Sequence, residues 1–295
     1  MTDPDTGDAL PDRLRLGLLG KARVVTGEHA PGSPQWSPAI RDLVKQSDLV
    51  VVDVTTPRRE IFVEWGWGIG AKKQVLLGVY RSGDREAHPA WVQERQLRAF
   101  GSKSEFDEFL GQVLRILDSF PDRVSSWVDD PCNEPLDYKP APQNVVLLGG
   151  LEQWDALRAR VAETAKENKF SLEVLDVQTR QNEAGILFDT IRAARKAATL
   201  VLTFDGSDCD LLACVAGGVF SMNDAYRIGS RKHQRKLVLL KRDGAPLPGL
   251  LATKPGVCTL SHIGESVDFL RSHFQQVNGS LSSAHSATKR HKAGR

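Results

Sequence analysis

Residues 48–77, which read DLVVVDVTTPRREIFVEWGWGIGAKKQVLL, carry the clearest chemical signal in the chain. An apolar run ends at Asp53, a Thr-Thr-Pro turn follows, and a helix-like stretch then places Glu64 between Val63 and Trp65. A carboxylate among large apolar side chains is costly to bury unless it is paired, hydrogen-bonded or used in chemistry. Glu64 is therefore the first candidate for a catalytic residue.

The turn before this helix has the features of an anion site. Thr55 or Thr56 can cap the helix N-terminus, and Pro57 suits its first position. Arg58 and Arg59 follow in the first turn, where cations oppose the helix dipole but free backbone amides favour an anion. A phosphate or carboxylate ligand would suit this arrangement. The alternative is that both arginines are solvated or pair with neighbouring acidic residues.

The helix offers a surface on which a sugar could lie. Glu60 and Glu64 are four positions apart and share a face, and Trp67 and Gly68 lie one turn further on. The alternate glycines of EWGWGIG weaken the helix but let a backbone or a flat ligand approach closely. The carboxylate could bind ribose hydroxyls or stabilise positive charge at an anomeric carbon. Alternatively, Glu64 pairs with an arginine, and Trp65 and Trp67 belong to the core.

The elements that must position these residues form two similar series on either side of a proline-rich segment. Segment 121–143 has no periodic apolar pattern and is interpreted as a linker. After it we expect strands at 144–150, 171–177, 199–206, 236–243 and 256–261, and helices at 152–169, 186–197, 210–228 and 264–277. Before it we expect strands at 22–28, 48–54, 74–80 and 96–102, and helices at 37–46, beyond residue 54, and at 105–120.

Alternating strands and helices predict parallel sheets covered by helices on both faces. The predicted fold class is α/β, with two flavodoxin-like or Rossmann-like units in tandem, the first trimmed at its N-terminus. The expected domains are 1–120 and 144–279, followed by a disordered basic tail at 280–295.

Three short segments of the first unit resemble a known signature. The run from Ser47 to Thr55, the segment 62–66 (FVEWG) and the segment 73–77 (KQVLL) resemble nucleoside 2-deoxyribosyltransferase-like and TIR-like domains. The resemblance covers about residues 37–80. It implies that Glu64 is the catalytic glutamate, which attacks the anomeric carbon in the transferases and is essential for breaking the nicotinamide–ribose bond in the TIR enzymes. It also implies that Asp53 contacts the substrate or orients the site.

The chain departs from that signature in several places. Arg59 and Glu60 stand where a polar residue such as asparagine is usual, and Gly68 replaces an alanine. In the second unit the position of the glutamate falls on Cys214 or Val215. Gly149, Gly150 and Asp205 remain candidates for binding a nucleotide there, with Gly217 and Gly218 as further positions of close approach. We therefore interpret the second unit as a degenerate partner.

Two functions from different classes follow. The first is cleavage or transfer at the N-glycosidic bond of a nucleoside, a nucleotide or NAD, with no metal and no separate cofactor. Glu64 and Asp53 would act on the sugar, while Thr55, Thr56, Arg58, Arg59, Glu60, Trp67 and Gly68 would contact the substrate. The second is a non-catalytic nucleotide-binding or signalling module, such as one in bacterial defence or regulation.

Composition, net charge and targeting signals indicate where either function would operate. The chain has 295 residues, 41% hydrophobic and 26% charged, and a net charge of +2, which is too mild to argue by itself for nucleic acid or membrane. Neither a nucleic acid nor a membrane is therefore expected as a partner. The basic tail KRHKAGR could contact nucleic acid or an acidic partner, but a short basic terminus is more often disordered. No run reaches the ~20 apolar residues of a spanning helix, and no signal peptide is recognisable, so a cytoplasmic location is expected. The four cysteines lack metal-ligand spacing and are expected to be reduced packing residues. A homo-oligomer is left open.

Overall fold

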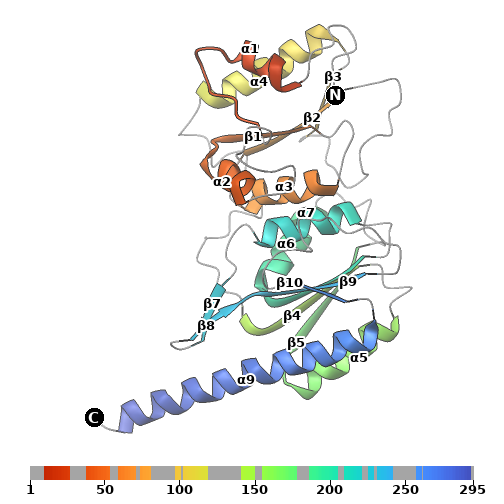
Figure 1. Ribbon diagram of the computed structural model, residues 1–295, viewed down its shortest axis with the longest axis vertical. Helices are drawn as coiled ribbons and strands as arrows, with labels where there is room; N and C mark the ends of the chain where they lie inside the picture. Colours follow the sequence, from red (N-terminus) through yellow and green to blue (C-terminus); the bar gives the residue numbers. More distant parts are fainter. Residues whose placement is uncertain are drawn as a thin grey trace.

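The computed structural model describes residues 10–26, 38–53, 59–70, 74–80, 97–100, 102–118, 141–149, 155–177, 186–204, 209–220, 225–228, 231–241, 257–260 and 262–293. Its strands form two parallel sheets flanked by helices, and one antiparallel pair (Figure 1). The predicted α/β class with parallel strands is confirmed. Among the described residues, no helix combines the length and apolar character needed to cross a bilayer.

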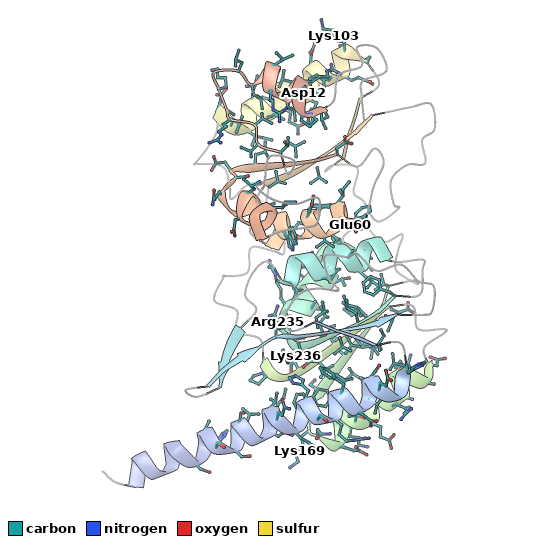
Figure 2. The ribbon with its side chains drawn as sticks, viewed as in Figure 1. Asp12, Glu60, Lys103, Lys169, Arg235 and Lys236 are labelled. Carbon is teal, nitrogen blue, oxygen red and sulfur yellow. The ribbon has the colours of Figure 1, made fainter. Side chains whose placement is uncertain are left out.

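A three-stranded sheet lies in the N-terminal half. Its strands are parallel and in chain order: β1 (Leu49–Asp53), β2 (Gln74–Tyr80) and β3 (Leu97–Phe100). One face is covered by α1 (Leu10–Gly17) and α4 (Lys103–Asp118), which carry Asp12 and Lys103 on the outer side of the molecule (Figure 2). The other face is covered by α2 (Pro38–Gln46) and α3 (Arg59–Gly70) (Figure 1).

A five-stranded parallel sheet lies in the C-terminal half. Its order is β10-β9-β6-β4-β5, with β4 (Ala141–Gly149), β5 (Ser171–Asp176), β6 (Ala197–Phe204), β9 (Lys236–Lys241) and β10 (Val257–Leu260). Counted along the chain, this is the order 2-1-3-4-5 of a doubly wound sheet. Every residue of the central strand β6 is buried, as expected for a strand covered on both faces.

Helices cover both faces of this sheet as well. One face carries α6 (Ile186–Lys196) and α7 (Cys209–Phe220), and the other carries α5 (Asp155–Glu167) and α9 (Ile263–Ala293) (Figure 1). A separate antiparallel pair consists of β7 (Ala225–Ile228) and β8 (Arg231–Gln234).

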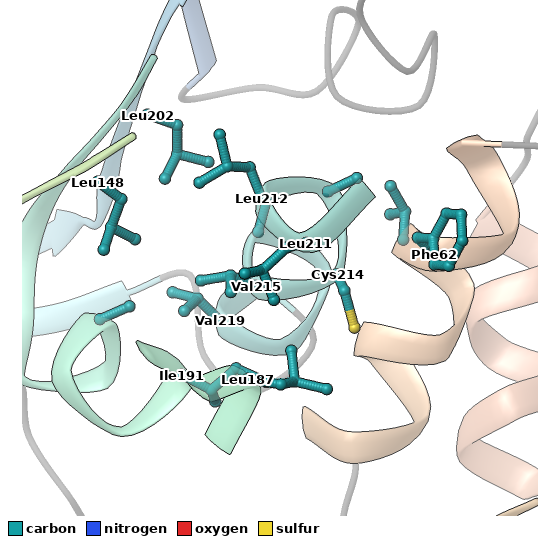
Figure 3. Close-up of a cluster of buried hydrophobic side chains, with 14 of the residues drawn as sticks. Phe62, Leu148, Leu187, Ile191, Leu202, Leu211, Leu212, Cys214, Val215 and Val219 are labelled. Carbon is teal, nitrogen blue, oxygen red and sulfur yellow. The ribbon is translucent and has the colours of Figure 1, made fainter. Parts of the chain in front are cut away.

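The two halves share one hydrophobic core where α3 packs on α7. The core runs from Val52 of β1 through Phe62 of α3 and Leu211 of α7 to Leu202 of β6. Figure 3 shows the part of this core around α7, with the sulfur of Cys214 directed toward α3. Cys214 is a free, buried thiol, as expected for a packing cysteine. The helices α3 and α7 therefore join the two sheets through their apolar sides.

Several predicted elements differ from the structure in the N-terminal half and at the linker. Residues 22–26 form no strand, so the predicted strand at 22–28 is wrong over its described part. Val24 instead packs against the cluster between α1 and α4, while Val25 is exposed, so the apolar alternation serves packing without a ladder. The strand β4 begins at Ala141, inside the segment interpreted as a linker.

Two further differences lie toward the C-terminus. The helix predicted through residue 228 ends at Phe220, and β7 occupies Ala225–Ile228. The closing helix does not end at residue 277, and 280–293 is helical where a disordered tail was expected. Leu281 and Ala284 continue to pack on the core beyond Val277, at the spacing of one helix face, which extends the helix past the predicted end.

Candidate functional site

Glu64 lies on α3, the helix between the three-stranded sheet and α7. The helix begins six positions after Asp53, which ends β1, and it packs on both β1 and β2. Glu64 is half-buried and about 7 Å from the start of the helix, and Glu60 precedes it by one turn. Figure 2 places Glu60 at the level where the two halves of the molecule meet. The sequence thus predicted correctly that a carboxylate would be withdrawn from water here.

Burial raises the pKa of Glu64 from its ordinary value of 4.5 to about 7, and the negative charge of Glu60 adds to this effect. A neighbouring arginine would act in the opposite direction, because a cation favours the ionised carboxylate and lowers its pKa. The side chains of Arg58 and Arg59 lie outside the described residues, so the alternative in which one of them pairs with Glu64 stays a prediction. At neutral pH the group is divided between its protonated and ionised forms.

The contact between α3 and α7 is made by glycines. A Cβ atom on Gly66 would collide with the carbonyl oxygen of Cys214 and lie 2.7 Å from the backbone nitrogen of Gly218. A Cβ atom on Gly217 would collide with the carbonyl oxygen of Val63 and lie 3.1 Å from its Cα. The two helix backbones therefore touch directly. The close approach predicted for Gly217 is an approach to a helix.

These contacts are reciprocal. Gly66 and Gly217 take equivalent places, as do Val63 and Cys214, with 151 positions between the members of each pair. The last residues of β1 and β6, Asp53 and Phe204, have the same separation. By this correspondence Val215 stands where the other helix has Glu64. The second half has no carboxylate at that position, as the sequence indicated.

The second half does not cover Glu64 through this contact. Glu64 is two positions from Gly66, which places it about 160° around the helix axis from the glycine that touches α7. Trp65 and Trp67 are instead core residues, 1% and 2% exposed, and Gly68 is buried. Trp67 and Gly68, which were predicted to contact the substrate, are therefore both buried in this structure.

The carboxyl edge of the five-stranded sheet was predicted to bind a nucleotide through its glycines. Gly149 ends β4 with a φ of 151°, and a Cβ atom there would collide with the Thr203 hydroxyl and lie 2.9 Å from its Cβ. The Thr203 hydroxyl donates a hydrogen bond to the carbonyl of Leu148 at 3.2 Å. The space beside Gly149 is therefore filled by Thr203, at the point where the strand order reverses.

Other predicted site residues lie outside the described residues: Thr55, Thr56, Arg58, Gly150 and Asp205. Arg59 begins α3, but its side chain is outside the described part. Within the described residues, no group of three or more His, Cys, Asp or Glu side chains could hold a metal ion.

One buried cation was missed by the sequence analysis. Arg235 is 5% exposed and donates hydrogen bonds to the carbonyl of Arg195 at 2.9 Å and to that of Val219 at 3.5 Å. These carbonyls lie in the last turns of α6 and α7, where a helix leaves its acceptors without internal partners. Arg235 therefore joins two helix C-termini. The only sequence signal was a basic residue directly before a buried strand.

The chain matches no family model, no curated protein and no solved structure. Its function is therefore inferred from the chemistry of the residues described above.

Proposed function

We propose that the chain cleaves or transfers at the N-glycosidic bond of a nucleoside, a nucleotide or NAD, with Glu64 as the reacting carboxylate. The observation that supports this most directly is the half-buried position of Glu64, with a pKa raised to about 7. Strongly perturbed carboxylates are commoner at functional sites than elsewhere. The place of Glu64 on the helix after β1 and Asp53 agrees with the resemblance to deoxyribosyltransferase-like and TIR-like domains.

The proposed reaction takes place at the anomeric carbon of the sugar. The bond between the anomeric carbon and the base nitrogen breaks, its electron pair leaves with the base, and positive charge develops on the ring. The ionised carboxylate of Glu64 either attacks the anomeric carbon or holds that charge, and water or a second base then takes the sugar. Partial desolvation strengthens the attraction, because a charge acts more strongly where water is excluded.

Asp53 and the first turn of α3 would complete the site in this proposal. Asp53, at the end of β1, would orient the ribose hydroxyls. Arg58 and Arg59 would neutralise phosphate groups at the helix N-terminus. Because the reaction needs the ionised carboxylate, kcat/KM should rise with pH and level off above pH 7.

We further propose that the chain is a tandem pair of related flavodoxin-like units of which only the first reacts. The equivalent contacts of Gly66 and Gly217 support the relation, and Val215 removes the carboxylate from the second unit. The second unit would serve to hold α3 in place. At the end of β4, Thr203 occupies the space that a side chain on Gly149 would need.

A non-catalytic nucleotide-binding module is the second candidate. The observation that favours it is the burial of Trp67 and Gly68, which removes a platform on which a base could stack. In that case nucleotides would stabilise the protein without being consumed.

These functions can be tested by incubating the purified protein with NAD and with a panel of ribo- and deoxyribonucleosides and nucleotides. The released base is detected by chromatography. Wild type is compared with Glu64→Gln and with the control Glu108→Gln, which alters an exposed carboxylate of α4. Base release that is lost in Glu64→Gln and retained in Glu108→Gln supports the enzyme. Absence of release from every substrate, with thermal stabilisation by a nucleotide in all three proteins, supports the binding module.

A further inference from the structure

The large apolar side chains that the described part of the chain leaves exposed gather in one short segment. Leu16 is 73% exposed, Leu19 is 82% exposed and Val25 is 42% exposed, and no other large apolar side chain among the described residues is exposed. A single exposed leucine is ordinary on a protein surface, but three such residues within ten positions form a patch. The outer surface of residues 10–26 and of α4 is called here the α1–α4 face.

The leucines of this segment lie on two opposite sides of α1. One set recurs at every fourth position and is buried in the cluster between α1 and α4: Leu10, Leu14 and Leu18. A Cβ atom on Gly17 would collide with the side chain of Leu110, so α1 lies directly against α4. Leu16 and Leu19 are three positions apart and lie on the outer side, where the helical turn continues past the end of α1. A helix with apolar residues on both sides is usually covered on both.

The α1–α4 face is open to a large partner. It lies at the end of the molecule that is remote from α9 (Figure 1). The three-stranded sheet separates it from α3 and from the C-terminal half, which lie on the other face of that sheet. A second molecule can therefore approach the α1–α4 face without meeting the C-terminal half.

The charges of the α1–α4 face have both signs. Residues 10–26 and 102–118 contain six basic and five acidic residues, so their net charge is +1. Such a balance suits neither the phosphate backbone of a nucleic acid nor an anionic membrane. Lys21 and Arg23 are exposed beyond the end of α1, and Asp107 and Asp118 are exposed on α4. The two aspartates are about three helical turns apart, so they share one side of α4.

We propose that the α1–α4 face binds a second copy of this chain about a two-fold axis. In such a contact both copies present the same surface, so that surface must complement itself. The apolar patch of one copy packs on that of the other. Lys21 and Arg23 of each copy lie against the aspartates of α4 in the second copy. The face meets both requirements, because it is apolar at Leu16 and Leu19 and carries cations and anions on separate elements.

The size of the face predicts a weak dimer. The 16 residues of α4 span about 24 Å, and two helices side by side are about 20 Å wide. Each copy therefore buries about 500 Å², or about 1,000 Å² in total, which is the size of a transient interface. Interfaces of this size do not reach nanomolar affinity without many strong contacts, so we expect a dissociation constant of about 1 to 100 µM.

Sedimentation equilibrium of the full chain, at concentrations from about 1 to 100 µM, measures this dimer. Leu16→Ser/Leu19→Ser should weaken it at least about 100-fold, because each substitution removes an apolar contact from both copies. The control Arg158→Glu/Arg160→Glu reverses two exposed cations of α5 in the C-terminal half and should leave the dissociation constant unchanged.

Charge reversal tests the proposed pairing of the two copies. Lys21→Glu/Arg23→Glu and Asp107→Lys/Asp118→Lys should each weaken self-association at least about tenfold, because like charges then face each other. An equimolar mixture of these two variants restores opposite charges across the contact. The mixture should therefore associate within about threefold of wild type.

Circular dichroism of every variant verifies that the fold is kept, and if the serine variant unfolds, the charge variants decide. A wild type that stays monomeric at 100 µM would overturn the proposal, and flotation of that monomer with phosphatidylserine vesicles would assign the patch to a membrane. A dimer that Leu16→Ser/Leu19→Ser does not weaken would also overturn it. So would a mixture of the charge variants that associates no more tightly than either variant alone.

Discussion

Replacement of Glu64 by glutamine should make the protein more stable above neutral pH. Glutamine keeps the size and polarity of the protonated side chain but cannot ionise. In wild type the folded state holds a proton on Glu64 up to about pH 7, whereas the unfolded chain releases it near pH 4.5. The folded state therefore binds more protons between these values, and the stability of wild type falls as the pH rises through this window.

The magnitude follows from the size of the pKa shift. A shift from 4.5 to about 7 predicts a loss of about 2.5 kcal/mol in the free energy of unfolding between pH 5 and pH 8. This is an upper value, since Glu64 is half-buried and water screens part of the effect. Below pH 4.5 wild type and Glu64→Gln should have nearly equal stability, and above pH 7 the difference between them should be constant.

Urea unfolding of wild type, Glu64→Gln and Glu60→Gln at half-unit steps from pH 4.5 to 8.5 measures this difference. All other titrating groups cancel when the variants are compared at each pH. Glu60→Gln should retain most of the pH dependence, because burial is the larger cause of the shift and the charge of Glu60 the smaller. Parallel curves for wild type and Glu64→Gln would refute the reasoning. A variant that becomes less stable than wild type as pH rises would show that a cation holds the ionised carboxylate.

Four further substitutions, one of them a control, test the packing, each by urea unfolding. Gly66→Ala should cost about 2 kcal/mol or more, because its Cβ atom meets the backbone of α7, whereas Gly111→Ala in α4, with nothing within 4 Å, should gain about 0.5–1 kcal/mol. Equal effects would contradict the direct contact of α3 and α7. Arg235→Met should cost about 3 kcal/mol through two lost hydrogen bonds to helix ends, and a neutral result would contradict that role. Gly149→Ala should destabilise by about 1–3 kcal/mol because Thr203 fills the space, and a stable variant would mean that this space is open.

The strands of the two parallel sheets and most helices were predictable because their apolar patterns are continuous. The run LVVV before Asp53 and the wholly buried β6 match their sequence signals. The hairpin β7–β8 was missed because AYRI and RKHQ lack the apolar alternation of a half-buried strand. The extension of α9 was missed since its last residues are polar and contribute little to a core.

For the candidate site, the sequence indicated which residues matter but not what surrounds them. The withdrawn position of Glu64 was evident from its large apolar neighbours. The glycines near Glu64 correctly predicted that another group approaches the helix backbone closely. The sequence does not show whether that group is a helix or a ligand. The backbone of the facing helix lies against Gly66 and against Gly217, and the side chain of Thr203 lies against Gly149. The upward direction of the pKa shift at Glu64 likewise depends on spatial neighbours.

The initial rate of base release at pH 8, measured for wild type and Glu64→Gln on the same panel of NAD, nucleosides and nucleotides, tests the central claim most directly. At this pH Glu64 is mostly ionised in wild type, and the variant should be at least as stable as wild type, so a loss of rate cannot be ascribed to unfolding. We predict that wild type releases the base from at least one substrate and that Glu64→Gln does not. Equal rates in the two proteins, or no release by wild type, would contradict a catalytic role for Glu64.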